Sequence, residues 1–518
     1  MHDQDHNRTS RRSFLAMSAA GAATGLLAGG TAAAGKGEGN SPHAAAAGGT
    51  AGSVAGSGGV TWHSTTQHAP WRVVAGATLG APSSKLFDKH VVVHLEQPLQ
   101  QIAGFGGAFS EKGWQALQSL PGALRAQALD ALFKPGAGTG FSVCRTPIGA
   151  NDFARQWYSY DEVDGDFGLG HFSIDNDRET LVPYILAARQ RRPDLRVWAS
   201  PWSPPTWMKS NHHYAMAPAW PGQPANGLGP DQVGMEGHDY FIQEERYFEA
   251  YARYFRRYVE EYGKAGVPIS MVMPQNEFNS AQPFPSCCWT PQGLARFIPH
   301  LGREMQVVGV EVFFGTLERA NADLLTQVLA DPACAAVIKG VGVQWAGKGA
   351  LEAIRERHPQ LPVWGSEQEC GIGTNDWHYA RYSWNLMKRY FASNAAAWTY
   401  WNMVAPEGGM SGWGWPQNSL LSVDTRAGTF RFNHEYYLLR HLSQFVLPGA
   451  HRLLADSFLG YENQLAFRNP DGSVVIVVQN ELSEPLPVNF ELGGRHLAAT
   501  LPADSFNTLV VPPQGLAG

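Results

Sequence analysis

The chain has few charged residues, few cysteines and no long apolar run. Only 16% of its 518 residues are charged, and 45 acidic against 39 basic residues give a formal net charge of −6. This balance excludes a basic nucleic-acid-binding scaffold, so we expect no nucleic-acid partner. Five cysteines exclude a disulfide scaffold, and we expect the adjacent Cys287 and Cys288 to be a reduced pair rather than a strained vicinal bridge. The 44% hydrophobic content excludes an intrinsically disordered chain.

Motifs for several kinds of catalytic centre are missing as well. Neither His-Glu-x-x-His nor Cys-x-x-Cys occurs, and we interpret His212-His213 as a solvated loop pair. The segment Gly104-Phe105-Gly106-Gly107 lacks the third glycine of a dinucleotide-binding loop. No Gly-x-Ser-x-Gly appears, which argues against a serine hydrolase. We therefore expect neither a metal nor a cofactor.

Residues 1–34 are predicted to be a twin-arginine export signal. Ser10-Arg11-Arg12-Ser13-Phe14-Leu15 precedes a mild Ala/Gly/Leu stretch and then small residues up to Ala34. The stretch is too short and too weakly apolar for a membrane span, so we expect no integral span. Residues 35–59 form a Gly/Ala/Ser-rich linker, and the folded part is expected to begin near Val60. We therefore predict a secreted or periplasmic protein; the alternative is an Ala-rich tail with a chance arginine pair.

Short apolar runs alternate with helical stretches between about residues 101 and 440. This alternation predicts a parallel sheet, and eight units favour a closed α/β barrel over an open sheet. Helices are expected at Glu179–Gln190, Glu244–Tyr262 and Asp376–Phe391. The eight strands are expected at Ile102–Phe109, Phe141–Ile148, Arg196–Ser200, Ile269–Met273, Glu311–Gly315, Ile338–Val343, Leu361–Gly365 and Ala396–Trp401.

After about Pro448 the apolar pattern changes to a period of two residues. The runs Gln464–Arg468 and Val474–Gln479 flank Asn469-Pro470-Asp471-Gly472-Ser473, which is a strong hairpin turn. We assign residues 441–518 to a small all-β domain with further strands at Val488–Leu492, His496–Leu501 and Asn507–Val511. Residues 60–100 also contain strand-like runs and are expected to join this domain.

Two glutamates follow strands at the same predicted end of the barrel. The active site of such a barrel forms at the carboxyl ends of its strands. The fourth strand runs into Gln275-Asn276-Glu277 and the seventh into Ser366-Glu367-Gln368-Glu369. Two carboxylates at one end are what glycoside cleavage needs, because one protonates the leaving oxygen and the other attacks or activates water. For a single glutamate, a helix N-cap or a surface ion pair would be the simpler interpretation.

Aromatic and polar residues follow other predicted strands. The third strand ends in ASPWSPPTWMK (199–209), whose prolines fix a rigid loop and whose two indoles could form a wall for a sugar face. Asp152 follows the second strand, and Trp401 lies at the end of the eighth. Core packing explains a single tryptophan but not this recurrence, so we expect a carbohydrate partner. A non-catalytic carbohydrate-binding protein is the alternative, although it would not need both glutamates.

The motifs at these strand ends resemble glycoside hydrolase family 30, the group of glucosylceramidases and β-1,6-glucanases. The matching segments occur in the order and spacing of the family over most of residues 100–425. They are GFGGAFSEKG (104–113), RTPIGANDF (145–153), ASPWSPPTWMKSN (199–211), PQNE (274–277), PSCCWTP (285–291), GSEQECG (365–371) and WTYWNMVAPEGG (398–409).

The resemblance implies a (β/α)8 TIM barrel with a β-sandwich side domain built from the C-terminal strands and the segment before the barrel. It also implies a retaining double-displacement mechanism, in which the two carboxyl groups lie roughly 5–5.5 Å apart. Residue by residue, Glu277 is similar to the acid/base, Glu367 to the nucleophile and Asn276 to the residue that holds the sugar 2-hydroxyl. Positions that line the sugar pocket correspond to Asp152, Trp202 and Trp401.

Two positions leave the substrate and the nucleophile open. Gln344 stands where glucosylceramidases have a histidine, and residues 344–348 resemble the microbial β-1,6-glucanases instead. We therefore predict a secreted β-1,6-glucanase that uses Gln344 for substrate binding, with a glucosylceramidase-type β-glucosidase as the alternative. Glu369 lies two residues after Glu367, and residues i and i+2 of a strand point to the same side, so spacing alone does not choose between them.

Overall fold

The computed structural model describes residues 59–81 and 90–516. The predicted export signal (residues 1–34) and the predicted linker up to residue 58 lie outside the described residues. No helix in the described part of the chain combines the length and the apolarity needed to cross a membrane.

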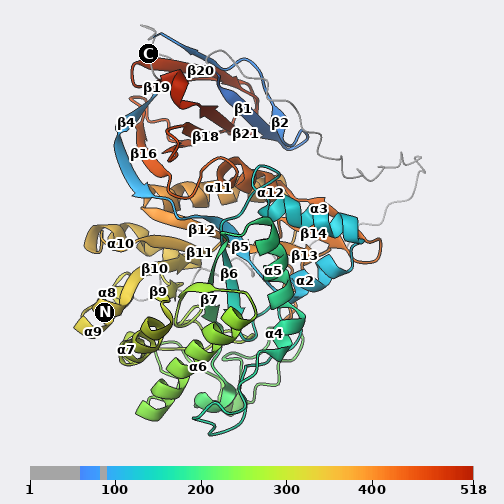
Figure 1. Cartoon of the computed structure of the whole chain (residues 1–518), viewed down its shortest axis with the longest axis vertical. Coiled ribbons are helices and arrows are strands. Elements are labelled where there is room, and N and C mark those ends of the chain that lie inside the picture. The colour runs from blue at the N-terminus through green and yellow to red at the C-terminus, as the bar shows by residue number, and fades with distance from the viewer. Residues whose placement is uncertain (1–58, 82–89, 517–518) are drawn as a thin grey trace, which may run out of the picture. The chain divides into compact units, whose positions relative to one another are not determined.

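Eight parallel strands close into a barrel, as the alternating pattern predicts (Figure 1). Strands that follow one another in the chain pair side by side, and β12 closes the ring against β5. Trp198 and Trp364 belong to strands that are not neighbours and contact each other at 6.3 Å between ring centroids, so side chains fill the interior. The strands are β5 (Gly104–Ala108), β6 (Val143–Ile148), β7 (Arg196–Pro201), β8 (Ile269–Val272), β9 (Glu311–Leu317), β10 (Ile338–Gln344), β11 (Val363–Glu367) and β12 (Ala395–Asn402).

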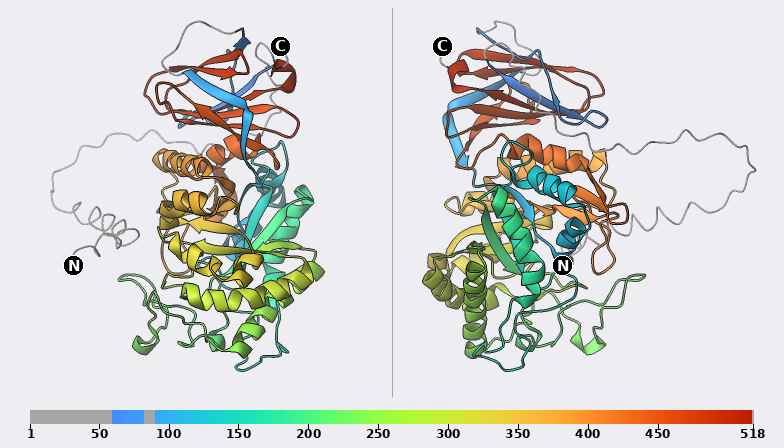
Figure 2. Two further views of the ribbon diagram at one scale, coloured as in Figure 1. Left: turned by 90° about the vertical axis from the view of Figure 1, so that its left-hand side faces the viewer. Right: turned by 45° about the vertical axis from the view of Figure 1, so that its right-hand side comes forward.

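Most of the helices surround this ring (Figure 2), whereas the short C-terminal helix α13 packs against the β-sandwich core. The longest, α6, buries Phe248, Tyr251, Phe255 and Tyr258 at helical spacing, which fixes the face turned to the core. The predicted helix at 179–190 is interrupted, because α4 ends before Thr180 and α5 begins after it. The helices are α2 (Glu111–Gln118), α3 (Gly122–Phe133), α4 (Asp175–Glu179), α5 (Leu181–Arg191), α6 (Glu245–Lys264), α7 (Pro291–Val308), α8 (Asp323–Leu329), α9 (Pro332–Val337), α10 (Leu351–Arg357), α11 (Trp377–Ala392), α12 (His434–Ser443) and α13 (Pro513–Leu516), with 3-10 turns η1 (Thr206–Met208), η2 (Pro230–Gln232) and η3 (Trp345–Ala350).

Within the described residues, ten strands build the β-sandwich, so the expected fold class is confirmed. In Figure 1 the N-terminal strands, coloured blue, lie among the C-terminal strands, coloured red. A separate apolar cluster, which includes Trp62, Val91, Ile476 and Phe490, forms its core. The strands are β1 (Thr61–Thr66), β2 (Arg72–Val73), β3 (Thr78–Gly80), β4 (His90–Gln101), β16 (His451–Asp456), β17 (Gln464–Arg468), β18 (Val474–Asn480), β19 (Leu486–Leu492), β20 (Arg495–Leu501) and β21 (Ser505–Val511).

Helix α12 links the barrel chain to the sandwich. Its buried His441 is hydrogen-bonded through Nδ1 to Thr508 at 2.9 Å and through Nε2 to Thr65 at 2.9 Å. The domain border that we predict between residues 440 and 441 falls inside this helix, and the domain limits stay a prediction. A further small sheet precedes α12 and consists of β13 (Val404–Pro406), β14 (Leu421–Asp424) and β15 (Thr429–Phe432).

Candidate active site

The carboxyl ends of the barrel strands place the predicted site residues together. Gln344 and Glu367 are the last residues of β10 and β11, and Trp401 lies one residue before the end of β12. Asn276 and Glu277 follow β8. Because all eight strands run in the same direction, these side chains meet at one face of the barrel.

Arg145 of β6 connects these strand ends. Its Nη1 lies 2.8 Å from Oε2 of Glu367, and its Nη2 donates to Oδ1 of Asn276 at 2.7 Å and to Oγ of Ser200 at 2.8 Å. The guanidinium also lies over the indole of Trp202, 4.3 Å from the ring centroid. Arg145 is fully buried. Its charge is therefore compensated by one carboxylate and by neutral groups at two other strand ends, those of β7 and β8.

Glu367 accepts hydrogen bonds on both carboxylate oxygens. Oε2 accepts from Arg145 and, at 3.3 Å, from Nε2 of Gln344. Oε1 accepts from the indole Nε1 of Trp345 at 2.9 Å. Three donors, one of them cationic, hold the orientation of the carboxylate.

Glu277 has a backbone conformation that is rare for its residue type. Its φ is 47°, in the left-handed region, and its N–H donates to Oγ1 of Thr316 at 2.8 Å. Oε1 accepts from Nε2 of Gln344 at 3.3 Å, and Oε2 accepts from Nε2 of Gln282 at 3.4 Å. Such backbone strain is concentrated at functional sites, where the surrounding contacts maintain it.

Gln344 contacts both glutamates through one nitrogen. Nε2 lies 3.3 Å from Oε1 of Glu277 and 3.3 Å from Oε2 of Glu367, so these two oxygens are at most twice that distance apart. Oε1 of Gln344 accepts from Oγ of Ser366 at 2.9 Å, which fixes the direction of the amide. The two carboxyl groups therefore face the same small volume.

Asn276 is oriented by three donors to its carbonyl oxygen. Oδ1 accepts from Arg145, from Oγ1 of Thr316 at 3.2 Å and from Nε2 of Gln344 at 3.2 Å. With Oδ1 engaged in this way, the amide NH₂ of Asn276 is the group suited to donate to a ligand hydroxyl.

Tryptophans form one wall beside the carboxylates. The rings of Trp202 and Trp401 contact each other with 5.2 Å between centroids. They belong to an aromatic cluster with Phe153, Trp413 and Trp415. Asp152 is buried near this wall and accepts from Nε2 of Gln417 at 3.1 Å. A wall of indoles with a carboxylate at its edge is suited to the apolar face and the hydroxyls of a sugar ring.

Two family models match the chain. The glycosyl hydrolase family 30 TIM-barrel domain matches residues 102–446, and the glycosyl hydrolase family 30 beta sandwich domain matches residues 459–509. The chain belongs to glycosyl hydrolase family 30. The resemblance that we infer from the strand-end motifs is therefore confirmed, and the chain is a family 30 glycosidase rather than a non-catalytic carbohydrate-binding protein.

Relatives of this family 30 chain carry two kinds of name. It is 28% identical to the lysosomal acid glucosylceramidase of Mus musculus over 424 residues, which cover 76% of this chain and 77% of the mouse protein. It is 25% identical to the endo-1,6-beta-D-glucanase of Neurospora crassa over 441 residues, which cover 80% and 86% of the two chains. The structure of SrfJ from Salmonella typhimurium shares the fold, with a TM-score of 0.75, 23% identity and coverage of 87% and 99%.

Glu369 lies apart from the carboxylate pair of this family 30 site. Its Oε1 accepts from Nζ of Lys348 at 2.6 Å, and its Oε2 accepts from the hydroxyl of Tyr382 at 2.7 Å. Strand β11 ends at Glu367, so the alternation of sides along a strand no longer applies at position 369. The contacts of the described residues therefore favour Glu367 as the partner of Glu277.

Several residues of the family 30 site are absent from the predicted set. Arg145, Trp345, Gln282 and Thr316 contact the two glutamates or their neighbours directly. For Trp345 and Thr316 the sequence signal is a position at or just after a strand end. Arg145 lies inside β6, and Gln282 lies in the loop after β8, so they lack even this signal. That signal is weak, because many strand-end residues only pack or cap a helix.

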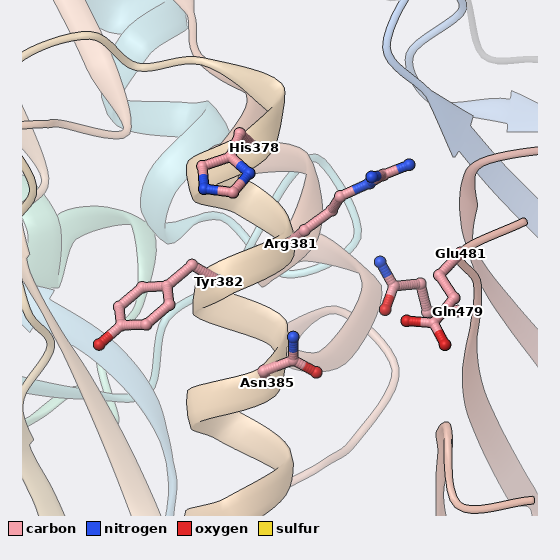
Figure 3. Close-up of a pocket in the computed structure, with 6 residues that line it drawn as sticks. All are labelled: His378, Arg381, Tyr382, Asn385, Gln479 and Glu481. Carbon is pink, nitrogen blue, oxygen red and sulfur yellow. The ribbon is translucent and has the colours of Figure 1, made fainter.

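A polar pocket of about 340 Å³ lies elsewhere, between α11 and β18. In Figure 3 Arg381 and Asn385 extend toward Gln479 and Glu481, whereas Tyr382 points the other way. None of the predicted site residues lines this pocket, and we assign it no role in the chemistry.

The cysteines and the acidic and histidine side chains form no second centre among residues 59–81 and 90–516. All five cysteines, including Cys287 and Cys288, are free and buried, as the expected reduced pair requires. Burial raises the pKa of the Cys287 thiol to about 12, which keeps it protonated. No group of three or more His, Cys, Asp or Glu side chains in these residues is arranged to hold a metal ion.

Proposed function

We propose that this family 30 enzyme is a retaining β-glucosidic hydrolase with Glu277 as acid/base and Glu367 as nucleophile. The contacts of Gln344 Nε2 with both carboxylates support this assignment most directly. They hold these two oxygens within twice 3.3 Å of each other, which is compatible with the roughly 5–5.5 Å separation of the carboxyl groups in retaining enzymes.

The mechanism has two displacement steps. In the first, a carboxylate oxygen of Glu367 attacks the anomeric carbon while the carboxyl proton of Glu277 passes to the glycosidic oxygen, and the C1–O bond breaks. In the second, Glu277 removes a proton from water, the water oxygen attacks C1, and the ester bond to Glu367 breaks. The Arg145 and Trp345 bonds to Glu367 hold its carboxylate in line for attack.

Asn276 and the tryptophans bind the sugar in this proposal. The amide NH₂ of Asn276 donates to the 2-hydroxyl, a contact that strengthens as the transition state forms. Trp202 and Trp401 cover a face of the ring, and Asp152 accepts from its hydroxyls. Gln344 donates to both carboxylates and cannot titrate, unlike a histidine at that position.

The substrate that we propose is a β-1,6-linked glucan. The Gln344-Trp345-Ala346-Gly347-Lys348 segment and the 25% identity to the Neurospora crassa endo-1,6-beta-D-glucanase support it. The 28% identity to the mouse lysosomal acid glucosylceramidase supports a β-glucoside with a lipid leaving group as the second candidate.

Digestion of pustulan, laminarin, xylan and glucosylceramide separates these candidates. We expect new reducing ends from pustulan alone. Release of glucose from glucosylceramide without cleavage of pustulan would instead favour the glucosylceramidase-type activity over the β-1,6-glucanase. Proton NMR of the first product tests the mechanism, because double displacement produces the β-anomer before mutarotation. An initial α-anomer would contradict retention.

We also propose export by the twin-arginine route, on the basis of Arg11 and Arg12. Replacing both by lysine should retain the enzyme in the cytoplasmic fraction of the producing cell. Unchanged appearance of the double variant outside the cytoplasm would contradict this route.

A further inference from the structure

Arg319 lies just after a strand end, in the neighbourhood of the acid/base glutamate, and the proposed mechanism does not use it. It follows β9 by two residues, and its Nη1 donates to Oε2 of Glu318 at 2.6 Å. Its Nη2 is paired with Glu236, which comes from the long loop after β7. Two carboxylates thus hold the guanidinium, although 29% of the side chain remains accessible.

A chain of polar contacts connects Arg319 to one particular oxygen of Glu277. Nη2 of Arg319 lies 3.5 Å from Oγ of Ser280, which accepts from Nε2 of Gln282 at 2.5 Å. The same Nε2 lies 3.4 Å from Oε2 of Glu277. The other oxygen, Oε1, is the one that shares Gln344 with Glu367. Arg319 is therefore connected to the oxygen of Glu277 that does not share Gln344 with Glu367.

The leaving group of a glycoside lies beside the acid/base. The reacting sugar occupies the space between the two carboxylates, and the oxygen that Glu277 protonates belongs to the leaving group. A guanidinium held in a fixed plane is a hydrogen-bond donor, which matches hydroxyls and not hydrocarbon. Glu236 and Glu318 keep the plane in place before substrate arrives, so little side-chain entropy is lost on binding.

We propose that Arg319 binds the hydroxyls of a sugar leaving group and so selects glycosides in which a second sugar follows the scissile bond. The inference rests on the proposed function, because it takes Glu277 as the acid/base. It assigns the leaving-group site to a carbohydrate and not to a lipid.

Gentiobiose and ethyl β-glucoside test this role. Both release a primary alcohol, so both need acid catalysis to a similar extent, but only gentiobiose releases a sugar. Arg319→Met is expected to lower kcat/KM for gentiobiose roughly ten- to hundred-fold more than for ethyl β-glucoside. Arg319→Lys, which keeps the charge without the planar fork, should lie between Arg319→Met and the unaltered enzyme.

Arg256→Met is the matched control. Arg256 also pairs with two glutamates, Glu260 and Glu304, but on the outer helices α6 and α7. Its replacement should leave the ratio of the two kcat/KM values unchanged.

If Arg319→Met lowers both activities equally, or lowers neither, the inference is wrong while the proposed function stands. If the unaltered enzyme cleaves ethyl β-glucoside but neither gentiobiose nor pustulan, the proposal that the leaving group is a sugar is wrong. If Glu277→Gln retains activity on every substrate, the proposed function itself fails.

Discussion

Nη1 of Arg145 lies 2.8 Å from Oε2 of Glu367, and both residues are buried at the end of the barrel. Removing one partner of a buried ion pair leaves an uncompensated charge, which costs about 3–5 kcal/mol. Arg145→Met is therefore expected to lower kcat/KM for an aryl β-glucoside by at least about a hundred-fold. Arg196 is the first residue of β7 and so lies at the other end of the barrel, and Arg196→Met should retain nearly full activity. Equal activities of the two variants would disprove the role of Arg145.

Glu367 and Glu369 are distinguished by their own substitutions. Glu367→Gln should abolish turnover, because a neutral amide does not attack C1. Glu369→Gln should retain activity within about ten-fold, since its carboxylate contacts Lys348 and Tyr382 rather than Glu277. Trapping with a 2-fluoro-glucosyl fluoride followed by peptide mapping should label Glu367. A label on Glu369 would show that Glu369, and not Glu367, is the nucleophile.

Lys209 stabilises the loop that carries the acid/base glutamate. Its buried Nζ donates to the carbonyl oxygens of Ser286 at 2.7 Å and of Tyr214 at 2.9 Å, and thus connects the loops after β7 and β8. Lys209→Met leaves the Ser286 carbonyl without this donor, at about 1–3 kcal/mol, whereas the Tyr214 carbonyl still accepts from the N–H of Ser286. We expect a lower melting temperature and reduced kcat. The exposed Lys264→Met should change stability by no more than about 0.5 kcal/mol, and a similar result for Lys209→Met would refute this role.

Asp177 should make stability depend on pH. Its carboxyl accepts from the hydroxyls of Tyr158, Tyr160 and Tyr262, and burial raises its pKa to about 6. An unfolded aspartate titrates near about 3.9, so between these values the folded state binds more protons. The contribution of Asp177 to the free energy of unfolding is therefore highest below about pH 4 and falls as the pH rises toward 6, by up to about 1.4 kcal/mol per pH unit.

Urea titrations of the unaltered enzyme and of Asp177→Asn at pH 4, 5, 6 and 7 measure this dependence. The asparagine does not titrate, so the fall in unfolding free energy between pH 4 and 6 should be smaller in the variant. Identical slopes in the two proteins would show that Asp177 is not the responsible group.

Most of the architecture could be predicted from local patterns. All eight barrel strands overlap their predicted runs. They could be predicted because an apolar run that ends in polar or proline residues is visible within a few neighbouring positions of the sequence. The hairpin at Asn469–Ser473 follows from its turn residues, and Arg468 pairs with Val474. The strand at His451–Asp456 and the helix at His434–Ser443 are absent from the predictions, since their partners come from distant segments such as Gln101 and Thr508.

The amino-acid order alone placed Glu277, Asn276, Gln344 and Glu367 at strand ends of a parallel barrel, and parallel strands bring their carboxyl ends to one face. Only the tertiary structure decided which atoms meet there. Arg145 joins Glu367 to Asn276, one amide of Gln344 contacts both glutamates, and Glu369 is held by Lys348 instead. Which residues end a strand depends on a few neighbours in the chain. A hydrogen bond such as that between Arg145 and Glu367, which are 222 positions apart, forms only when the eight strands close into a ring.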